Sequence, residues 1–216
     1  MALQKTIVQQ LHRSDILQSF SYDFMKEHLN GKGFVLGVFV KSRLVAFRNV
    51  YFPDKHDNMW NLGNDIGLGS SELDKVANLQ MVCVHPDYRG NALAMRMNRL
   101  SLQLIRDNGA HEHVCATVSP YNYWNIRILL NCGFHIKKLK HKYRGKLRYV
   151  VHRQLGRPVT FEPGTAIEIS LDDFTFQKIL MDDGYCGLDI RAKKDHYRVC
   201  DIFKASQWKI VFERAK

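Results

Sequence analysis

One segment in the middle of the chain has the residue types and spacing needed to bind an anion. Pro86 favours an extended residue before it, and so ends a buried strand cleanly. Gly90 and the small residues after it allow a ligand to approach the backbone closely. A helix starting there would present N–H groups and a partial positive charge, which suit a pyrophosphate. The alternative is an ordinary strand, turn and helix without a ligand. The segment reads Val82-Cys83-Val84-His85-Pro86-Asp87-Tyr88-Arg89-Gly90-Asn91-Ala92-Leu93-Ala94.

Alternating strands and helices surround this segment and indicate an α/β fold with a partly parallel sheet. The helix after the turn repeats Leu93, Met97, Leu100 and Leu104 on one face, and Asn108-Gly109 ends it. A second helix begins at Asn122 and stops at Gly133. The predicted strands are residues 78–84, 114–118, 134–142 and 146–154, and the predicted helices are residues 92–107 and 122–132.

The N-terminal part is predicted to contain one helix and a hairpin. Ser14 precedes apolar residues at helical spacing, which predicts a capped amphipathic helix ending near Gly31. Residues 34–40 and 44–52 are two apolar runs typical of a β-hairpin. Residues 54–75 form a long polar loop, and loops of this length often carry function.

The C-terminal part, from Gly156 onward, has a different pattern. Residues 166–171 are predicted to be a strand and residues 173–181 a helix capped by Asp172, and no internal repeat is evident. Three further strands are expected, starting at Cys186, Tyr197 and Trp208. The predicted domains are therefore residues 1–156 and a small α+β extension at residues 157–216. This extension either stands apart or adds strands to the main sheet.

The central segment resembles the acetyl-CoA motif of the GNAT acetyltransferase superfamily, Gln/Arg-x-x-Gly-x-Gly/Ala, at Arg89-x-x-Ala92-x-Ala94. A second signature of that superfamily is an Asn that opens a helix and a Gly-Phe pair eleven residues later, which Asn122 and Gly133-Phe134 match. The resemblance implies a mixed sheet flanked by helices and an acetyl-CoA site. It implies pantetheine contacts from Val82, Cys83, Val84 and Asn122, and pyrophosphate contacts from Arg89, Gly90, Asn91, Ala92, Leu93 and Ala94.

The chain departs from the family pattern at three positions. Ala92 stands in place of the first Gly, Asn78 in place of the usual Glu base, and Leu129 in place of the usual Tyr acid. Because an acceptor amine must lose a proton before it attacks, a water chain ordered by Asn78 and Gln80 is one route for that proton. Other candidates are Tyr123 as the acid and the loop carboxylates Asp65, Glu72 and Asp74 as bases.

Charge and cysteine usage limit the partners. The net charge is +11, and residues 113–161 hold ten basic residues and no acidic one. Lys138, Lys140, Lys142 and Arg144 alternate, so one strand face could receive an acidic substrate or a nucleic acid, although protection of a sheet edge is favoured. Five scattered cysteines and no export signal or membrane span predict a cytoplasmic protein. Cys132 and His135 are not expected to bind a metal.

Two functions from different classes follow from these patterns. The favoured one is an acetyl-CoA-dependent N-acetyltransferase in which an amine of a small molecule or protein attacks the thioester directly. The alternative is a GNAT-like binding module that senses acyl-CoA or binds RNA or another partner. The empty base and acid positions favour the module, and the intact cofactor motif favours the enzyme.

Overall fold

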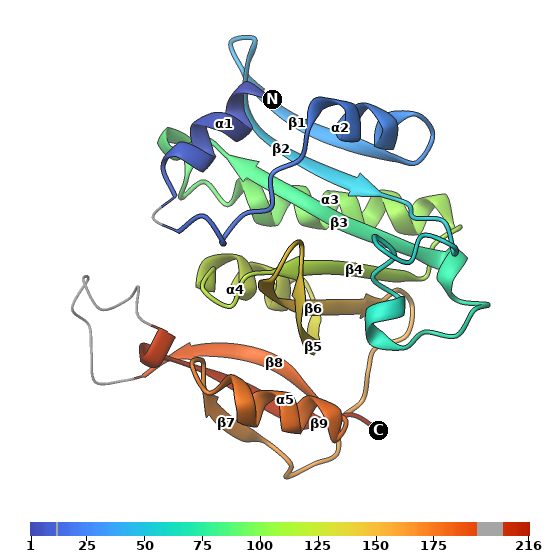
Figure 1. Cartoon of the computed structure of the whole chain (residues 1–216), viewed down its shortest axis with the longest axis vertical. Helices are drawn as coiled ribbons and strands as arrows, with labels where there is room; N and C mark the ends of the chain where they lie inside the picture. The colour runs from blue at the N-terminus through green and yellow to red at the C-terminus, as the bar shows by residue number, and fades with distance from the viewer. Residues whose placement is uncertain (12, 194–204) are drawn as a thin grey trace. The chain divides into compact units, whose positions relative to one another are not determined.

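The computed structural model describes residues 1–11, 13–193 and 205–216. The chain forms two compact units, Met1–Thr117 and Val118–Lys216, each combining a sheet with helices (Figure 1). The predicted mixed α/β class is therefore confirmed. In the described ranges, no helix has the length and apolar character needed to cross a membrane. The division predicted at residues 156–157 stays a prediction.

Unit 1 is built on a sheet with the order β1-β2-β3-β4. The first three strands are antiparallel neighbours, and β3 and β4 run parallel. Lys41 and Ser42 take positive φ in the two-residue turn between β1 and β2, as short hairpin turns require. The strands are β1 (Gly33–Val40), β2 (Arg43–Tyr51), β3 (Val76–Val84) and β4 (His113–Val118).

Among the described residues of unit 1, three helices and three short 3-10 turns accompany the sheet. Helices α1 and α2 lie on one face of the sheet and α3 on the other (Figure 1). Phe47, Met81 and Cys83 form the core beneath α1 and α2, where the side chains of alternate strand residues point. The elements are α1 (Ala2–Gln9), α2 (Tyr22–Leu29), α3 (Leu93–Asn108), η1 (Asn64–Ile66), η2 (Leu73–Lys75) and η3 (Pro86–Tyr88).

The single helix predicted from Ser14 to Gly31 is wrong. The helix there begins only at Tyr22, after Ser21 caps it by accepting a hydrogen bond from the Phe24 amide at 3.2 Å. Just before it, the side chain of Gln4 hydrogen-bonds both the N–H and the C=O of Phe20. These bonds satisfy the backbone of Phe20 outside a helix, and so the apolar spacing of this stretch reflects packing against the core instead.

Unit 2 contains an antiparallel sheet with the order β6-β5-β8-β9-β7. Because β8 pairs with β5, the C-terminal segment extends the sheet of the preceding hairpin. The strand predicted from Tyr197 lies outside the described residues. The elements are α4 (Tyr123–Asn131), β5 (His135–Lys142), β6 (Lys146–Gln154), β7 (Ile167–Ser170), α5 (Phe174–Asp182), β8 (Tyr185–Ala192), η4 (Ala205–Gln207) and β9 (Trp208–Arg214).

The cap of α5 is Asp173, one residue after the predicted Asp172. The Asp173 carboxylate accepts the N–H of Phe176 at 3.0 Å, which satisfies one of the unpaired amides of the first turn. Asp172 instead accepts the Ser170 hydroxyl at 2.6 Å, outside the helix.

Unit 2 also contains a structural repeat that the sequence did not reveal. Helix α4 and strands β5 and β6 correspond in order to α5, β8 and β9. Asn122 and Asp173 each cap their helix by accepting the amide three residues later. Gly133 and Gly184 each follow their cap by eleven residues and take positive φ, with φ values of 77° and 86°. The expectation of no internal repeat is therefore wrong at the level of structure.

The two copies meet at the antiparallel pair of β5 and β8. Ile136 and Gly187 lie three residues after the glycines that end α4 and α5, and these equivalent residues pair with each other. A Cβ on Gly187 would lie 3.0 Å from atoms of both Ile136 and Ile210. Glycine is therefore the residue that lets the two copies approach closely here.

Candidate active site

The turn that joins β3 to α3, residues 85–94, is named here the amide turn. Gly90 has φ 83°, and Ala92 is held in the left-handed region at φ 53° immediately before the helix. A left-handed residue with a side chain is strained, and such strain concentrates at functional sites. Ala92 is exposed and its side chain is small, and its predicted contact with the pyrophosphate stays a prediction.

The N–H groups of the amide turn are available to a ligand. Gly90, Asn91 and Ala92 are exposed, and Leu93 and Ala94 are half-buried. Within the described chain, no hydrogen bond uses the backbone N–H of any of these five residues as a donor. Consecutive unpaired N–H groups at the start of a helix of 16 residues form an anion site.

The amide turn is held in place from outside the helix. The N–H of His85 donates to the Val45 carbonyl at 2.8 Å, and its imidazole lies 2.8 Å from the Arg43 guanidinium. The side-chain amide of Asn91 donates to the Tyr88 carbonyl at 3.1 Å. These contacts fix the turn without using its outward N–H groups.

Strand β3 leaves one edge open beside the amide turn. It pairs with β4 only from Val76 to Leu79, where Leu79 lies opposite Ala116. Gln80 is an extra residue in the pairing with β2, because Asn49 lies opposite Met81 and Val50 opposite Leu79. Such a bulge twists a strand away from its neighbour. In the described part of unit 1, no strand pairs with this edge of residues 81–84, and an extended ligand could add to it.

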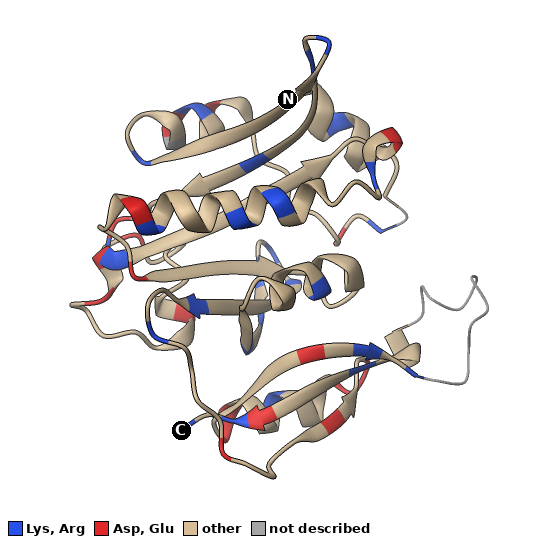
Figure 2. Cartoon of the chain, turned by 180° about the vertical axis from the view of Figure 1, so that it is seen from behind, with Lys and Arg blue, Asp and Glu red and all other residues tan. Residues whose placement is uncertain are grey.

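Positive charge continues along α3 beyond the amide turn. Arg96 and Arg99 are exposed, and Figure 2 shows basic residues spaced along the outer side of this helix. Arg89 is exposed in the turn itself. Charge of this sign near a helix start strengthens the attraction for a phosphorylated ligand.

Cys83 lies in the middle of this site but is an unreactive thiol. Burial raises the pKa of Cys83 to about 12, against a smaller opposing effect of the nearby Arg48 charge. A thiol with that pKa stays protonated near neutral pH and is a poor nucleophile. Cys83 is therefore not a candidate nucleophile.

The two predicted water-ordering residues occupy the same region of β3. Asn78 is 1% exposed, and its side-chain amide donates to the Trp60 carbonyl at 2.6 Å. Gln80 is half-buried and accepts a hydrogen bond from the Asn49 side chain at 3.4 Å. Neither side chain provides a base, and the roles predicted for Asn78 and Gln80 in ordering a water chain stay predictions.

Two residues near Asn78 were missed by the sequence reasoning. Tyr51 lies directly opposite Asn78 on β2, and its hydroxyl donates to the Asp57 carboxylate at 2.8 Å. The missed signal was the position of Asp57 in the loop that follows the second hairpin strand, where only Asp65, Glu72 and Asp74 were considered. Of those, Glu72 pairs with His113 and Lys75, and Asp74 with Lys55.

Asn122 and Tyr123 lie in unit 2, which is compact in its own right. The Asn122 side-chain oxygen accepts the N–H of Asn125 at 3.3 Å and so caps α4. Tyr123 is 5% exposed, and its ring stacks on Trp208 with centroids 5.4 Å apart. The roles predicted for Asn122 toward pantetheine and for Tyr123 as an acid stay predictions.

The basic hairpin formed by β5 and β6 differs in part from its prediction. Arg144 lies in the turn with φ 62°, so it does not continue the row of lysines on the strand. Lys138 forms an ion pair with Asp182 of α5 at 2.7 Å. Lys140 lies opposite Arg148, and like charges opposed in this way destabilise a sheet.

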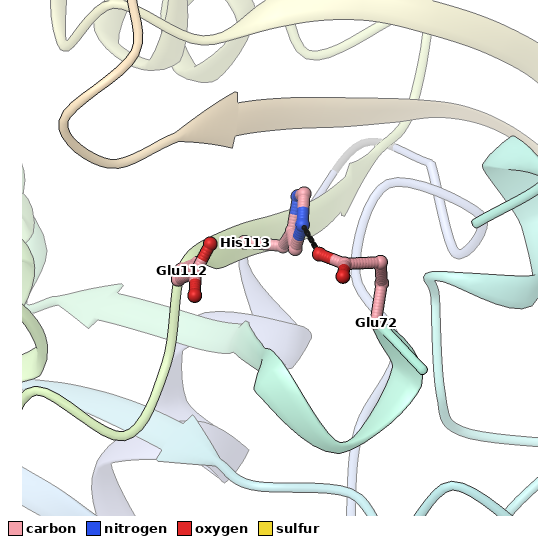
Figure 3. A group of neighbouring side chains, drawn as sticks. All are labelled: Glu72, Glu112 and His113. Carbon is pink, nitrogen blue, oxygen red and sulfur yellow. Dashed lines mark hydrogen bonds and ion pairs between the residues drawn. The ribbon is translucent and has the colours of Figure 1, made fainter. Parts of the chain in front are cut away.

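A cluster of Glu72, Glu112 and His113 joins η2 to the start of β4 (Figure 3). The His113 Nε2 lies 2.9 Å from a Glu72 oxygen. The Lys75 ammonium lies 3.4 Å from Glu72 and 3.0 Å from Glu112, so a cation already balances both carboxylates. An ion-pair network explains this cluster, and it ties the loop to the sheet.

Solved structures of acetyltransferases resemble this chain. The ribosomal-protein-S18-alanine N-acetyltransferase from Escherichia coli matches with a TM-score of 0.52 and 13% identity, over 72% of this chain and 88% of that one. The NatC complex bound to Gag peptide and CoA matches with a TM-score of 0.52 and 12% identity, over 71% and 89%.

A third similar structure is yncA from Salmonella typhimurium with its cofactor acetyl-CoA. Its TM-score is 0.52 at 14% identity, over 75% of this chain and 91% of that one. No protein-family model and no curated protein sequence matches the chain. The chain therefore has the fold of the GNAT acetyltransferases.

Proposed function

We propose that the protein is an acetyl-CoA-dependent N-acetyltransferase that transfers an acetyl group to an amine. The observation that carries the proposal is the open β3 edge at residues 81–84, which leads directly into the amide turn with its unused N–H groups. An extended arm ending in a pyrophosphate would fit these two features in sequence. Similar structures that hold CoA or acetyl-CoA support the same assignment.

In this proposal, the cofactor is held mainly by the backbone. The peptide groups of Val82, Cys83 and Val84 pair with pantetheine as an added strand would. The N–H groups of residues 90–94 bind the pyrophosphate, while the Arg89 N–H donates to the Pro86 carbonyl at 3.1 Å within the turn. A strand N–H next to the Gln80 bulge would also stabilise the oxyanion that develops on the thioester. Much of the rate then comes from holding amine and thioester together.

A thermal-shift titration with acetyl-CoA tests the binding step. Ligand at a hundred times its Kd should stabilise the fold by about 2.7 kcal/mol. A salt-sensitive shift with RNA and none with acetyl-CoA would favour the binding-module alternative and overturn the proposal.

The variant Ala92→Leu tests the placement of the pyrophosphate. A bulky side chain at this exposed, left-handed position should abolish the acetyl-CoA shift while the protein stays folded. Ala110→Leu, in the exposed turn after α3, is the matched control and should bind normally. Unchanged binding by Ala92→Leu would show that the amide turn is not the phosphate site.

Turnover is tested with acetyl-CoA and a panel of amines, measured as release of the CoA thiol. The panel should contain peptides with free N-termini, peptides with internal lysine, and polyamines. Transfer to at least one amine is expected. Tight acetyl-CoA binding without thiol release from any amine would favour a sensor of acyl-CoA.

A further inference from the structure

The Asn78 side chain on β3 cannot act as a base, but a carboxylate lies close by on another element. Tyr51 and Asn78 are directly opposed on β2 and β3, so their side chains share a face of the sheet. The Tyr51 hydroxyl donates to Asp57 Oδ2 at 2.8 Å. Tyr51 is 5% exposed, so this hydrogen bond is largely shielded from bulk water.

The backbone of Trp60 fixes the position of the carboxylate relative to Asn78. Its N–H donates to Asp57 Oδ1 at 3.0 Å, and its C=O accepts from the Asn78 side chain at 2.6 Å. The backbone of one loop residue, Trp60, therefore hydrogen-bonds to both Asp57 and Asn78. Both carboxylate oxygens of Asp57 accept a hydrogen bond in this arrangement.

The same face contains two buried oxygens that lack a donor. The side-chain oxygens of Asn49 and Asn78 have no hydrogen-bond partner in the described structure, and these residues are 0% and 1% exposed. Buried polar atoms of this kind are normally satisfied, by ordered water where the protein supplies no group. Both oxygens could therefore accept a hydrogen bond from a donor that the described chain does not supply.

The surrounding charge favours a cation. Glu27 of α2 and Asp54 of the loop act on Tyr51 together with Asp57. Burial, followed by the hydrogen bond to Asp57 and these negative charges, raises the pKa of Tyr51 above its ordinary value. The phenol therefore stays neutral and can pass a proton on without storing charge itself.

We propose that the Asp57 carboxylate, acting through the Tyr51 hydroxyl, is the terminal proton acceptor for a cationic amine substrate. This inference rests on the acetyltransferase function proposed above. It places the acceptor amine on the face of the sheet that α2 covers, beside the paired residues Tyr51 and Asn78. It assigns to a loop the role that a strand carboxylate would otherwise have.

Each proton that moves in the proposed reaction has a donor and an acceptor. The ammonium of the acceptor gives one proton to the Tyr51 oxygen while the phenol proton passes to Asp57. The neutral nitrogen attacks the thioester carbon, a C–N bond forms, and the carbonyl electrons move to oxygen. The C–S bond then breaks, the sulfur keeps the electron pair, and it takes a second proton from the nitrogen. The products are an amide and the CoA thiol, and Asp57 releases its proton to water.

Asp57 also closes a turn by accepting the Trp60 N–H. The variants must therefore remove the proton acceptor or the relay without unfolding this turn. Asp57→Asn retains an oxygen that can accept a hydrogen bond but removes the proton acceptor, and Tyr51→Phe removes the relay. Asp107→Asn is the control, because it makes the same change of charge at an exposed position near the end of α3, the helix on the other face of the sheet. The thermal shift that acetyl-CoA produces should be the same in all three variants as in the wild type.

The experiment measures kcat and KM across pH with acetyl-CoA and the best amine of the panel, and then with hydroxylamine. Asp57→Asn should lower kcat about 100-fold near neutral pH, a typical effect for a lost proton acceptor, and Tyr51→Phe should lower it similarly. Both should leave KM for acetyl-CoA unchanged, and Asp107→Asn should resemble the wild type. With hydroxylamine as the acceptor, the loss of kcat in Asp57→Asn and Tyr51→Phe should be smaller, because this amine is largely neutral at the assay pH.

Two outcomes would overturn the inference while the proposed function stands. One is an active wild type with Asp57→Asn activity within threefold of it at every pH. The other is an equal deficit with hydroxylamine and with the basic amine, which would indicate a structural role for Asp57. If the wild type neither binds acetyl-CoA nor releases thiol, the proposed function itself fails, and this inference fails with it.

Discussion

The backbone conformation of Ala92, at the proposed phosphate site, lowers the stability of the fold. Its φ of 53° is favourable for glycine and strained for alanine. We expect Ala92→Gly to raise the free energy of unfolding by about 1 kcal/mol and to retain acetyl-CoA binding. Urea unfolding provides the measurement. Ala94→Gly, inside the first turn of α3, should instead destabilise by about 0.5–1 kcal/mol, and equal effects of the two changes would contradict this view.

His135 makes the stability of unit 2 sensitive to acid. Burial, with the charges of Lys137 and Arg153, lowers the pKa of His135 to about 4. In the unfolded chain the imidazole takes up a proton near its ordinary pKa of about 6.5. The neutral, buried His135 therefore does not lower the free energy of unfolding above that pH. As the pH falls from there toward 4, only the unfolded chain takes up the proton, and the free energy of unfolding decreases.

The variant His135→Asn should flatten this acid dependence. Urea midpoints measured between pH 7 and pH 4 should fall less for the variant than for the wild type. His141→Asn, at an exposed position of the same strand, is the matched control. A fall as steep as that of the wild type would show that another group causes it.

At the scale of elements, Glu72 links the loop of residues 52–75 to β4. The hydrogen bond from His113, and a weaker one from Lys75, lower the pKa of Glu72. A carboxyl whose pKa is lower in the folded than in the unfolded chain stabilises the fold at every pH above its unfolded pKa. This stabilisation is lost as the pH falls through the pKa of the folded state. The loop that holds Asp57 should therefore loosen in acid before the sheet does.

Glu72→Gln should produce the same loosening at neutral pH. Amide hydrogen exchange in residues 62–75 should become faster, while exchange in β3 stays slow. Asp74→Asn removes a more exposed ion pair to Lys55 and is the control, for which little change is expected. Unchanged exchange in Glu72→Gln would show that the cluster does not anchor the loop.

Elements with local end signals were predictable from sequence, and contacts between distant residues were not. Helix α3 was predicted from its apolar periodicity and from Gly109 at its end, and α4 from Asn122 at its start and Gly133 after its end. The N-terminal helix was misplaced because Gln4, far away in sequence, fixes the backbone of Phe20. The Tyr51–Asp57 pair was missed because only the strand register places it beside Asn78.

At the scale of the whole molecule, the contact between the repeated halves of unit 2 depends on Gly187. Gly187→Val should destabilise the fold by about 1–3 kcal/mol, because its side chain would overlap Ile136 and Ile210. Adding Ile136→Ala should recover part of that loss, as expected for residues in contact. Chemical unfolding of both single variants and of the double variant gives the coupling. Strict additivity would contradict close packing at this point.

The repeat also bears on how many nucleotide molecules one chain can hold. Helix α5 copies the design of α4, but Asp173 puts a carboxylate where α4 has the neutral Asn122. In the described chain, β7 pairs only with β9 and has no parallel neighbour like the one β3 gives to β4. Isothermal calorimetry should therefore give a stoichiometry of one acetyl-CoA per polypeptide. The second copy would then add a helix and strands to unit 2 without adding a second ligand site.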